Sequence, residues 1–553
     1  MYNVQSSDAV HWYMNEIGSR VVAESGRPSD RHHLGKLILL GLKDAPDFIL
    51  QVDGGTGESE TCQSVLQRSI RCATTFTNVG LKPNDVIAIM SNNNLDAAIP
   101  MYGALYTGVG VACIDVTFKI PEMVATFSNL LPKIVFCINK IASDVQQALD
   151  ELCLKANIVT FGEDKGFCSF TEFLETRGDD GAIENFKASD FDPADTTALL
   201  ISTSGSTGLP KSANLTHKNL AVCVPYMWIN YDKFPTPAQK VIFVAPLQWY
   251  SALYKMIFSP IFRVTRIQSS LVVSPTMNME HAYFLINKYK PNIMMTSPGF
   301  MTALLKPGAT EICDFSCFET ILCGGSAPHE SLLQEMKKAS PNTQFYTVYG
   351  MSELSGIVFN YACELPGSCG KAFGLCKYRL VNIETMEDIT EPNIPGELWI
   401  KSPGVFKGYY NNEEVTTQVL TKDGWLRTGD LMKRDENWNF YFVERVKMML
   451  KYYSHQISPT ELEEVIMKHP GVYEVAITSV PERDAGDLVV AAVVPHDGHH
   501  LTAQEIKDLV KEALSDSKQL RGGVVFMKQL PMTSTSKLDR TKLAAMVRDM
   551  ERE

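Results

Sequence analysis

Short apolar runs alternate with stretches of helical periodicity along the first 350 residues of the chain. Residues 85–90 and 133–138 read as buried strands, and each follows a helical stretch. Strands that alternate with helices are typical of a mostly parallel sheet covered by helices. The pattern therefore predicts an α/β fold up to about residue 190 and a second α/β block from about 195 to 350.

The longest uncharged run, residues 97–114, has the length at which a membrane span is considered. Its 18 residues include Pro100, Gly103, Gly108 and Gly110. These residues interrupt a continuous span. We therefore expect a buried helix, a turn and a strand, and no transmembrane segment.

The pattern changes after residue 395. Residues 396–401 alternate with period two and residues 437–443 read as a further strand, which predicts a small antiparallel, barrel-like unit. Charge density rises after Val443, so we place a domain boundary there. We predict a large N-terminal domain, residues 1–443, with two α/β subdomains and the small β unit, and a small α+β C-terminal domain, residues 444–553.

Two helix-start signals support the α+β assignment of the C-terminal domain. Ser458 with Glu461, and Thr502 with Glu505, each form the pattern of a capping box at the start of an amphipathic helix. Between them, residues 472–480 alternate like a strand.

Composition restricts the possible partners and the compartment. Because 51 Lys and Arg residues face 63 Asp and Glu residues, the net charge is −12, which disfavours a nucleic-acid or anionic-membrane partner. The 13 cysteines include no CxxC pair, so we expect free thiols in a reducing compartment. The chain shows no secretory signal pattern and no Ser-Lys-Leu tail. We predict a cytoplasmic protein, with a peroxisomal one as the alternative; the sequence leaves the oligomeric state open.

The most informative stretch for chemistry is residues 199–211, LLISTSGSTGLPK. A buried strand enters a loop rich in glycine and hydroxyl groups, which ends at Lys211. Glycines let backbone amides approach an anion, hydroxyls donate to phosphate oxygens, and a lysine adds a mobile positive charge. The composition predicts a phosphate-binding loop, with an ordinary Ser/Gly surface turn as the alternative. The loop residues assigned to the nucleotide are Ser204, Gly205, Ser206, Thr207 and Gly208.

This loop is not a Walker A loop, because the fifth residue after Gly205 is Pro210, where that motif has glycine. It resembles the nucleotide loop of the adenylate-forming superfamily, which includes acyl-CoA synthetases, beetle luciferases and nonribosomal adenylation domains. Further motifs follow in that superfamily's order: YGMSE at 349–353, WLRTGD at 425–430 and KQLRGGVVF at 518–526. The last is especially close to luciferases and plant coumarate-CoA ligases, and the resemblance covers nearly the whole chain.

The resemblance implies an enzyme that forms an acyl-adenylate from a carboxylic acid and ATP and then transfers the acyl group to coenzyme A. Lys211 would hold the β- and γ-phosphates, Lys537 would bridge the acyl carboxylate and the α-phosphate, and Glu353 would bind Mg²⁺. Tyr349 would stack on adenine and Asp430 would bind the ribose hydroxyls. The nucleotide-binding residues implied in addition to the loop are Gly324, Gly325, Ser326, Tyr349, Gly350, Ser352, Asp430 and Arg445.

In members of this superfamily that make thioesters, a mobile C-terminal domain rotates between the two half-reactions. The resemblance makes Glu444 and Lys447 the hinge, at 444–447, with Lys447 as the pivot. After rotation, Lys451 and Ser454 would face the site in place of Lys537.

Several residues depart from the superfamily pattern. Ser212, Ser454 and Ser536 stand where glycine is usual, and a non-glycine residue adopts a left-handed conformation only at a cost. Trp249 falls where a histidine that gates the substrate is usual. Its indole would shrink the acid pocket or stack on an aromatic acid, and packing into the core is the alternative. The residues assigned to the acid pocket are Gln248, Trp249, Tyr250 and Ala327.

These observations predict an ATP-dependent, AMP-forming acyl-CoA synthetase for medium- or long-chain fatty acids, with ATP, Mg²⁺ and coenzyme A. A nucleotide- or acyl-binding protein of the same fold without ligase turnover is one alternative. An aryl-acid ligase or a luciferase-type enzyme is the other.

Overall fold

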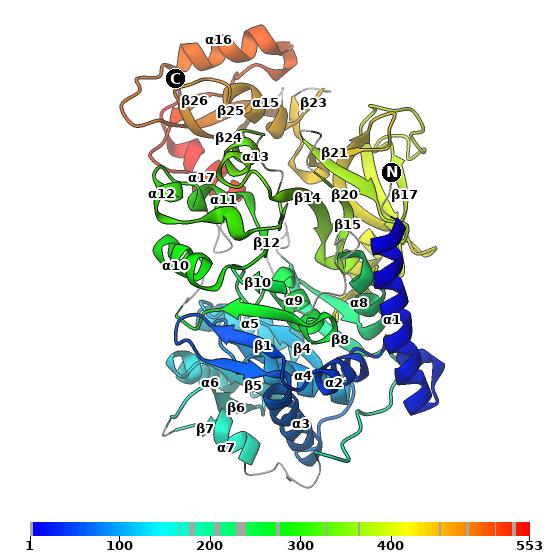
Figure 1. Cartoon of the computed structure of the whole chain (residues 1–553). Coiled ribbons are helices and arrows are strands. Elements are labelled where there is room, and N and C mark those ends of the chain that lie inside the picture. The colour runs from blue at the N-terminus through cyan, green and yellow to red at the C-terminus, as the bar shows by residue number, and fades with distance from the viewer. Residues whose placement is uncertain are drawn as a thin grey trace. The chain divides into compact units, whose positions relative to one another are not determined.

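The chain folds into two compact units, drawn in Figure 1. Unit 1 comprises Met1–Lys377 and Lys401–Leu426, and unit 2 comprises Tyr378–Ile400 and Arg427–Glu553. The chain therefore passes between the two units three times. The computed structural model describes residues 4–164, 166–175, 183–203, 211–227, 239–271, 277–326, 328, 330–362, 365, 367–452, 455–482, 486–514, 516–532 and 538–553.

The first sheet of unit 1 is mostly parallel, as the alternating pattern predicts. Neighbours from β8 through β4, β3, β5 and β6 to β7 run parallel, while β9 pairs antiparallel with both β8 and β19. The predicted strands at 85–90 and 133–138 are confirmed as β3 and β5. In spatial order the strands are β19 (Gly408–Tyr409), β9 (Lys211–Thr216), β8 (Thr197–Thr203), β4 (Gly110–Cys113), β3 (Val86–Met90), β5 (Ile134–Cys137), β6 (Asn157–Thr160) and β7 (Cys168–Ser169).

Helices cover this sheet, and α6 and α7 lie beside β5, β6 and β7 (Figure 1). The uncharged run 97–114 forms α4, a turn at Gly108 with φ 78°, and β4, which confirms its interpretation. In the part of the chain that the structure describes, no helix combines the length and apolarity needed to cross a bilayer. The helices are α3 (Cys62–Asn78), α4 (Ala98–Thr107), α5 (Ile120–Leu130), α6 (Ala142–Glu151) and α7 (Phe170–Glu175).

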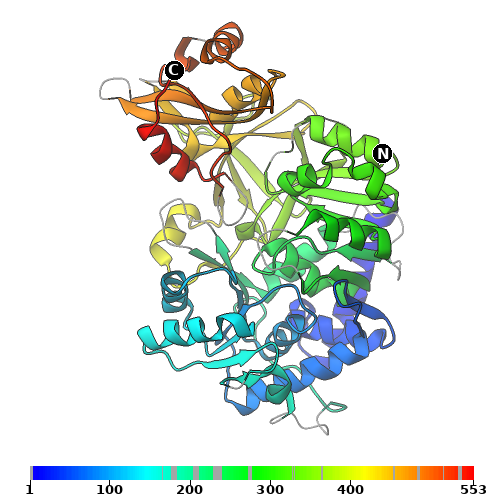
Figure 2. The same cartoon turned by 90° about the vertical axis from the view of Figure 1, so that its left-hand side faces the viewer.

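In the second sheet, neighbouring strands run parallel from β1 through β11, β10, β12 and β13 to β14. Figure 2 shows the helices of residues 279–339, in green, beside strands of the same colour. Apolar residues of these helices, such as Leu285 and Met336, pack on strand residues such as Ile321. In order, the strands of unit 1 in this sheet are β2 (Ser59–Thr61), β1 (Ile49–Asp53), β11 (Val264–Gln268), β10 (Gln239–Ile242), β12 (Ile293–Thr296), β13 (Thr320–Gly324), β14 (Gln344–Met351), β15 (Gly356–Ala362) and β16 (Ser368–Ala372). The remaining helices of unit 1 are α1 (Val4–Ser25), α2 (Leu34–Asp44), α8 (His217–Cys223), α9 (Tyr250–Phe262), α10 (Met279–Tyr289), α11 (Pro298–Leu304), α12 (Ala309–Ile312), α13 (Glu330–Ala339) and α14 (Glu413–Val419).

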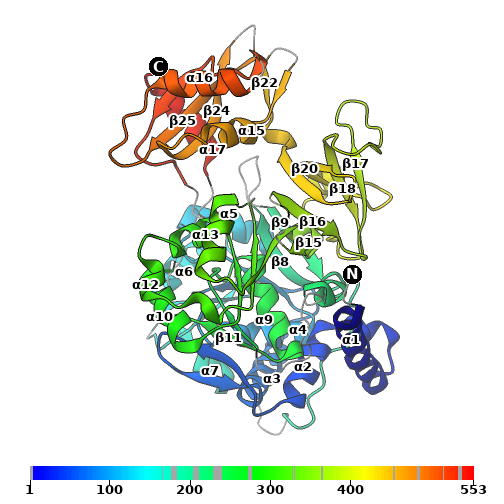
Figure 3. The same cartoon turned by 45° about the horizontal axis from the view of Figure 1, so that its top comes forward.

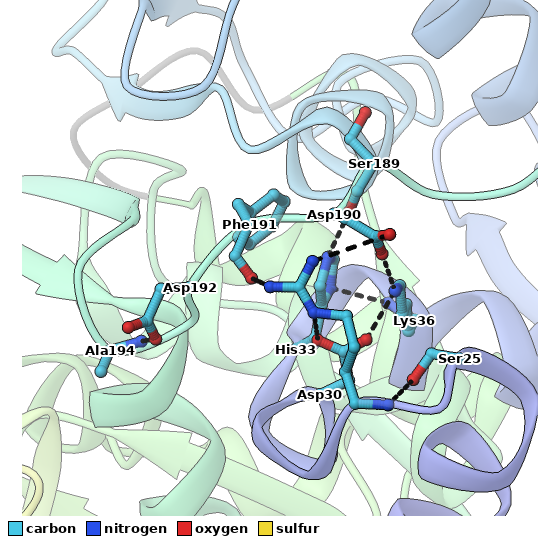
Figure 4. Close-up of polar contacts among 10 residues, drawn as sticks. Ser25, Asp30, His33, Lys36, Ser189, Asp190, Phe191, Asp192 and Ala194 are labelled. Atoms are coloured by element: carbon cyan, nitrogen blue, oxygen red, sulfur yellow. Dashed lines mark hydrogen bonds and ion pairs between the residues drawn. The ribbon is translucent and has the colours of Figure 1, made fainter.

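A buried polar cluster joins the start of α2 to the segment at 189–190 (Figure 4). His33 is fully buried; its Nδ1 accepts a hydrogen bond from the Lys36 backbone amide at 3.1 Å, and its Nε2 lies 3.0 Å from the Ser189 carbonyl oxygen. The Lys36 ammonium bridges the buried Asp30 and the exposed Asp190 at 2.7 and 2.6 Å. These contacts cap α2 and fasten a distant segment to it.

Unit 2 contains two sets of strands. The first set is β17 (Lys377–Val381), β18 (Gly396–Lys401), β20 (Leu426–Arg434) and β21 (Phe440–Arg445) in that order. β18 matches the strand predicted at 396–401. The strand predicted at 437–443 begins three residues later, because Asn439 closes a turn on Asp435 through its backbone and side-chain amides, and it continues through Glu444 and Arg445.

The second set of strands in unit 2 is sandwiched between helices. Residues of α15 and α16 pack on one face of β24 and β25, and residues of α17 pack on the other (Figure 3). The capping box at Thr502 and Glu505 is confirmed, and Ser458 caps α15 while the Glu461 carboxylate pairs with Lys518. The elements are β22 (Leu450–Tyr452), β23 (His455–Ile457), β24 (Val472–Glu482), β25 (Gly486–Pro495), β26 (Gly523–Phe526), α15 (Pro459–Ile466), α16 (Ala503–Ala513) and α17 (Arg540–Asp549).

The prediction of an α/β fold with a large N-terminal and a small C-terminal region is confirmed. The boundary predicted after Val443 lies within unit 2 and stays a prediction. All twelve cysteines that the structure describes are free thiols.

Candidate active site

The predicted phosphate loop connects two antiparallel strands. Thr203 ends β8 and lies opposite Lys211, the first residue of β9, and the Thr203 hydroxyl donates to the Lys211 carbonyl oxygen at 3.2 Å. The buried strand predicted before the loop is confirmed as β8, and a second strand, β9, begins at Lys211. Ser212 stands within regular strand β9 opposite Ser202, so the loss of glycine at this position costs no backbone strain.

Tyr409 joins two of the predicted catalytic residues. The Lys211 ammonium lies 5.7 Å from the centre of the Tyr409 ring, and the Tyr409 hydroxyl donates a 2.8 Å hydrogen bond to Oε1 of Glu353. The pairing of β19 with β9 brings Tyr409 to this position, since Tyr409 lies opposite Ala213. A positive charge near its ring and a buried carboxylate at its hydroxyl thus share one tyrosine. Such an arrangement is suited to binding phosphate and a divalent cation together.

The turn between β14 and β15 carries Glu353 and, two residues later, Ser355, which Tyr250 contacts. Glu353 lies in the single 3-10 turn Ser352–Leu354, followed by Ser355 in a left-handed conformation with φ 55°. The Tyr250 hydroxyl donates to the carbonyl oxygen of Ser355. Burial raises the pKa of Tyr250 well above its usual value, so the phenol stays protonated and keeps donating this hydrogen bond. The first turn of α9, where the predicted acid pocket begins, is therefore bonded to the turn that carries Glu353.

The predicted adenine-binding residues lie at the ends of two parallel strands. Gly324 is the last residue of β13 and pairs with Val348 of β14, just before Tyr349. The Tyr349 ring stacks on Phe359 of β15, with ring centres 5.4 Å apart and planes at 28°. A Cβ on Gly350 would lie 2.1 Å from the Gly356 carbonyl oxygen, so the close approach of the strands requires glycine there. The contact of Tyr349 with adenine stays a prediction.

Asp430 and Arg445, both predicted to bind nucleotide, form an ion pair in unit 2. They lie opposite each other on β20 and β21, and Arg445 Nε is 2.6 Å from Asp430 Oδ1. The Asp430 side chain is 1% exposed, whereas that of Arg445 is 52% exposed. Gly429, with φ 71°, turns the chain so that the Asp430 amide donates to the Thr428 hydroxyl. The carboxylate is thus fixed by its own strand and by the arginine across from it.

Glu444, assigned to the hinge, is bonded to the start of α15. Its carboxylate accepts hydrogen bonds from the Thr460 amide at 3.0 Å, the Thr460 hydroxyl at 2.9 Å and the Ser458 hydroxyl at 3.4 Å. Lys447 is exposed, and Lys451 lies on β22 opposite Gln456. The hinge role of Glu444 and Lys447 stays a prediction, as does the later role of Lys451.

Several predicted site residues lie outside the part of the chain that the structure describes. They are Ser204, Gly205, Ser206, Thr207 and Gly208 of the loop, with Ala327, Ser454 and Lys537. Gln248 and Trp249 precede α9 directly and are half-buried, as is Tyr250. Gly325 and Ser326 follow β13 directly.

Tyr409 is the described residue of this site that the sequence reasoning missed. The signal available was a pair of tyrosines directly after Gly408. The partner that gives this pair meaning is Glu353, which lies 56 residues earlier in the chain, and no local pattern indicates that contact.

Two sheets with parallel runs of strands in unit 1, followed by a smaller α+β region, have the architecture of adenylate-forming enzymes. Residues 42–410 match the family model described as AMP-binding enzyme, and residues 461–537 match the one described as AMP-binding enzyme C-terminal domain. The chain belongs to the AMP-binding enzyme family, with luciferases and CoA ligases among its relatives.

Three relatives illustrate this similarity. Luciferin 4-monooxygenase of Photuris pensylvanica is 31% identical over 520 residues, which cover 91% of this chain and 92% of that enzyme. 4-Coumarate–CoA ligase 4 of Arabidopsis thaliana is 26% identical over 514 residues, covering 90% and 88%. The crystal structure of ATP-bound MatB from Rhodopseudomonas palustris has the same fold, with a TM-score of 0.82 at 23% identity over 93% of this chain and 99% of that one.

Proposed function

We propose that this chain is an AMP-forming acid–thiol ligase, which activates a carboxylic acid with ATP and passes the acyl group to coenzyme A. The observation that carries the proposal is the grouping of Lys211, Tyr409 and Glu353 at the end of the predicted phosphate loop. The family assignment is compatible with this reaction, since CoA ligases are among the relatives.

In the first half-reaction, a carboxylate oxygen attacks the α-phosphorus of ATP, and pyrophosphate leaves. Two anions must approach, so positive charge around the phosphates lowers the barrier. Lys211 would hold the β- and γ-phosphates, and Lys537 would neutralise the charge between the acid and the α-phosphate. In the second half-reaction, a thiolate attacks the acyl carbon and AMP leaves.

Glu353 fits the role of a magnesium ligand. Its carboxylate is buried, and Tyr409 orients it through the hydrogen bond to Oε1. Mg²⁺ in nucleotide sites takes one or two carboxylates, with water and phosphate oxygens completing the shell. Among the described residues no cluster of three or more His, Cys, Asp or Glu forms a dedicated metal site. A single carboxylate that shares Mg²⁺ with ATP does not require such a cluster.

Asp430 would accept hydrogen bonds from the ribose hydroxyls. A carboxylate offers two oxygens with several lone pairs, so one oxygen can stay paired with Arg445 while the other accepts from the ribose. Arg445 is half-exposed and would reach the ribose or the phosphate end of the nucleotide. The ion pair supports this role because it fixes the orientation of the carboxylate before ATP arrives.

For the acid we propose a medium- or long-chain fatty acid, and the proposal includes the predicted cytoplasmic location. Trp249 keeps accessible surface beside the first turn of α9, which supports contact between its indole and the acid. The luciferin 4-monooxygenase and 4-coumarate–CoA ligase relatives favour an aromatic acid as the second candidate.

Exchange of labelled pyrophosphate into ATP tests the proposal, with fatty, aryl and amino acids each supplied in turn. Lys537→Ala is expected to lower exchange at least about 10²-fold while ATP binding survives, and Lys542→Ala, at an exposed lysine of α17, is the control. Failure of every acid to support exchange would rule out adenylation. Exchange without a CoA thioester product would indicate another acceptor.

Trp249→Gly tests the pocket separately. If the indole fills the acid pocket, its removal broadens the range of chain lengths accepted in the same assay. Unchanged acid selectivity would support the packing-only alternative.

A further inference from the structure

Glu397, on strand β18 of unit 2, uses both oxygens of its carboxylate. β18 lies beside β20 (Figure 3), and Oε1 of Glu397 accepts a hydrogen bond from the Gly429 amide of β20 at 3.2 Å. Its Oε2 accepts a 2.8 Å hydrogen bond from the indole N–H of Trp399. Trp399 stands two positions after Glu397, so both side chains lie on the same face of the strand. The carboxylate therefore links the backbone of β20 to a side chain of β18.

Two arginines restrain the indole that donates to this carboxylate. Arg379 and Arg427 come from β17 and β20, the two neighbours of β18. Their guanidinium carbons lie 5.2 Å and 4.7 Å from the centre of the Trp399 ring, which is only 6% exposed. Attraction between a guanidinium and an aromatic ring favours this packing. The indole therefore keeps its N–H directed at Glu397 and fixes the position of the second carboxylate oxygen.

Gly429 is a point in β20 where the backbone needs such a restraint. Its φ of 71° is in the left-handed region, and a Cβ there would meet nothing within 4 Å, so no neighbouring atom crowds this position. Because glycine has more backbone freedom than any other residue, hydrogen bonds must hold the turn. Glu397 supplies one of them. The Thr428 hydroxyl supplies another, since it donates to the carbonyl oxygen of Leu398 at 2.7 Å.

Asp430 follows this turn directly, and its direction depends on it. A rotation at Gly429 would change the direction in which the Asp430 side chain leaves the strand. The ion pair with Arg445 is a weaker restraint, because the Arg445 side chain is 52% exposed and water screens such a pair. The hydrogen bond from Gly429 to Glu397 therefore acts on the carboxylate that the proposed function assigns to the ribose hydroxyls.

We propose that Glu397 is a positioning residue for the nucleotide, which sets the direction of Asp430 through Gly429 and thereby the recognition of the ribose hydroxyls. The inference rests on the proposed function, which assigns Asp430 to the ribose. In this role Glu397 touches neither ATP nor the acid. A nucleotide without the 2′-hydroxyl leaves the carboxylate short of one donor, and a site built for a hydroxyl discriminates against such an analogue. Glu397 thus contributes to the selection of ATP over 2′-deoxy-ATP.

ATP and 2′-deoxy-ATP form a matched pair of probes, since they differ only in the 2′-hydroxyl. Titration calorimetry with the magnesium salts gives a Kd for each nucleotide, and the ratio of the two Kd values measures the preference. We expect wild type to bind ATP at least about 10-fold more tightly, and Glu397→Met, which lacks both carboxylate oxygens, to reduce this preference below about 3-fold. Glu397→Gln keeps one acceptor oxygen for two donors and is expected to lie between. Glu436→Met, at an exposed carboxylate between β20 and β21, is the control and should keep the wild-type ratio.

The ratio separates positioning from general stabilisation, because a loss of stability alone weakens the binding of both nucleotides equally. An unchanged ratio in Glu397→Met, or equal Kd values for the two nucleotides in wild type, overturns the role of Glu397. The Tm without ligand reports whether each variant has folded. If Glu397→Met has not, a wild-type ratio in Glu397→Gln overturns the inference instead.

The same measurement distinguishes this inference from the proposed function, since binding requires no turnover. A preference for ATP that is lost in Glu397→Met supports the role of Glu397 even if no acid supports pyrophosphate exchange, an outcome that refutes only the ligase proposal. Failure of the wild type to bind ATP would refute both.

Discussion

Acidification is expected to destabilise unit 1 through His33. This imidazole is fully buried, receives the Lys36 amide on Nδ1 and stacks near Phe191, with ring centres 4.1 Å apart (Figure 4). A second proton would have to be placed on Nδ1, against the amide that donates to it. Burial, which removes hydration from the charged form, lowers the pKa of His33 to about 4.

The magnitude follows from proton linkage. The pKa of histidine in the unfolded chain is about 6.5, so between pH 6.5 and pH 4 the unfolded state binds more protons than the folded state. The free energy of unfolding therefore falls as the pH falls through this window and is unaffected by His33 above it. For these two pKa values, the unfolding free energy falls, relative to neutral pH, by about 2 kcal/mol at pH 5 and by up to about 3.4 kcal/mol below pH 4.

His33→Asn is the informative variant, because asparagine can cap α2 but does not titrate. Urea unfolding, followed by tryptophan fluorescence at pH 7.5 and pH 5, gives the loss of unfolding free energy on acidification for each protein. The difference in this loss between variant and wild type is the contribution of His33. We expect the variant to lose about 2 kcal/mol less than wild type. His500→Asn, at an exposed position, is the control. Equal losses in wild type and His33→Asn would refute a buried, neutral His33.

Three further substitutions test other contacts. Gly350→Ala places a Cβ 2.1 Å from a carbonyl oxygen of β15, so calorimetry should show a free energy of unfolding that is lower by about 2 kcal/mol or more. Gly299→Ala is the control, because a Cβ there meets nothing within 4 Å and should leave the free energy of unfolding nearly unchanged. Tyr409→Phe removes the hydrogen bond to Glu353 and should lower kcat/KM for magnesium–ATP about 10-fold, whereas unaltered kinetics would mean that this carboxylate needs no orienting group. Glu444→Ala removes three hydrogen bonds at the start of α15 and should destabilise unit 2 by about 1–3 kcal/mol. If the α15 amides of this variant exchange hydrogen as slowly as those of the wild type, this prediction is wrong.

Local chemistry made much of the fold predictable. The helix, turn and strand at 97–114 follow from glycine at a left-handed turn, and the capping box at Thr502 follows from side chains within one helical turn. The strand before the phosphate loop follows from the apolar run that leads to Thr203. In each case the deciding interactions lie within a few residues of the chain.

Contacts between distant residues were beyond such reasoning. Tyr409 meets Glu353 because β19 adds to the edge of the first sheet beside β9, an arrangement that depends on the whole fold. The sequence pattern marked Ser458 as a helix cap but could not show that Glu444, 14 residues earlier, also binds there.

The three passages of the chain between the units bear on how the protein is synthesised. β18 ends at Lys401, but β20, its neighbour in unit 2, begins only at Leu426. The residues made in between carry β19 and α14 of unit 1. At ribosomal speeds of about 5–20 residues per second, β18 waits roughly 1–5 seconds for its partner. During that interval the edge of β18 that later pairs with β20 exposes unpaired backbone N–H and C=O groups, which a chaperone would shield from pairing with another chain.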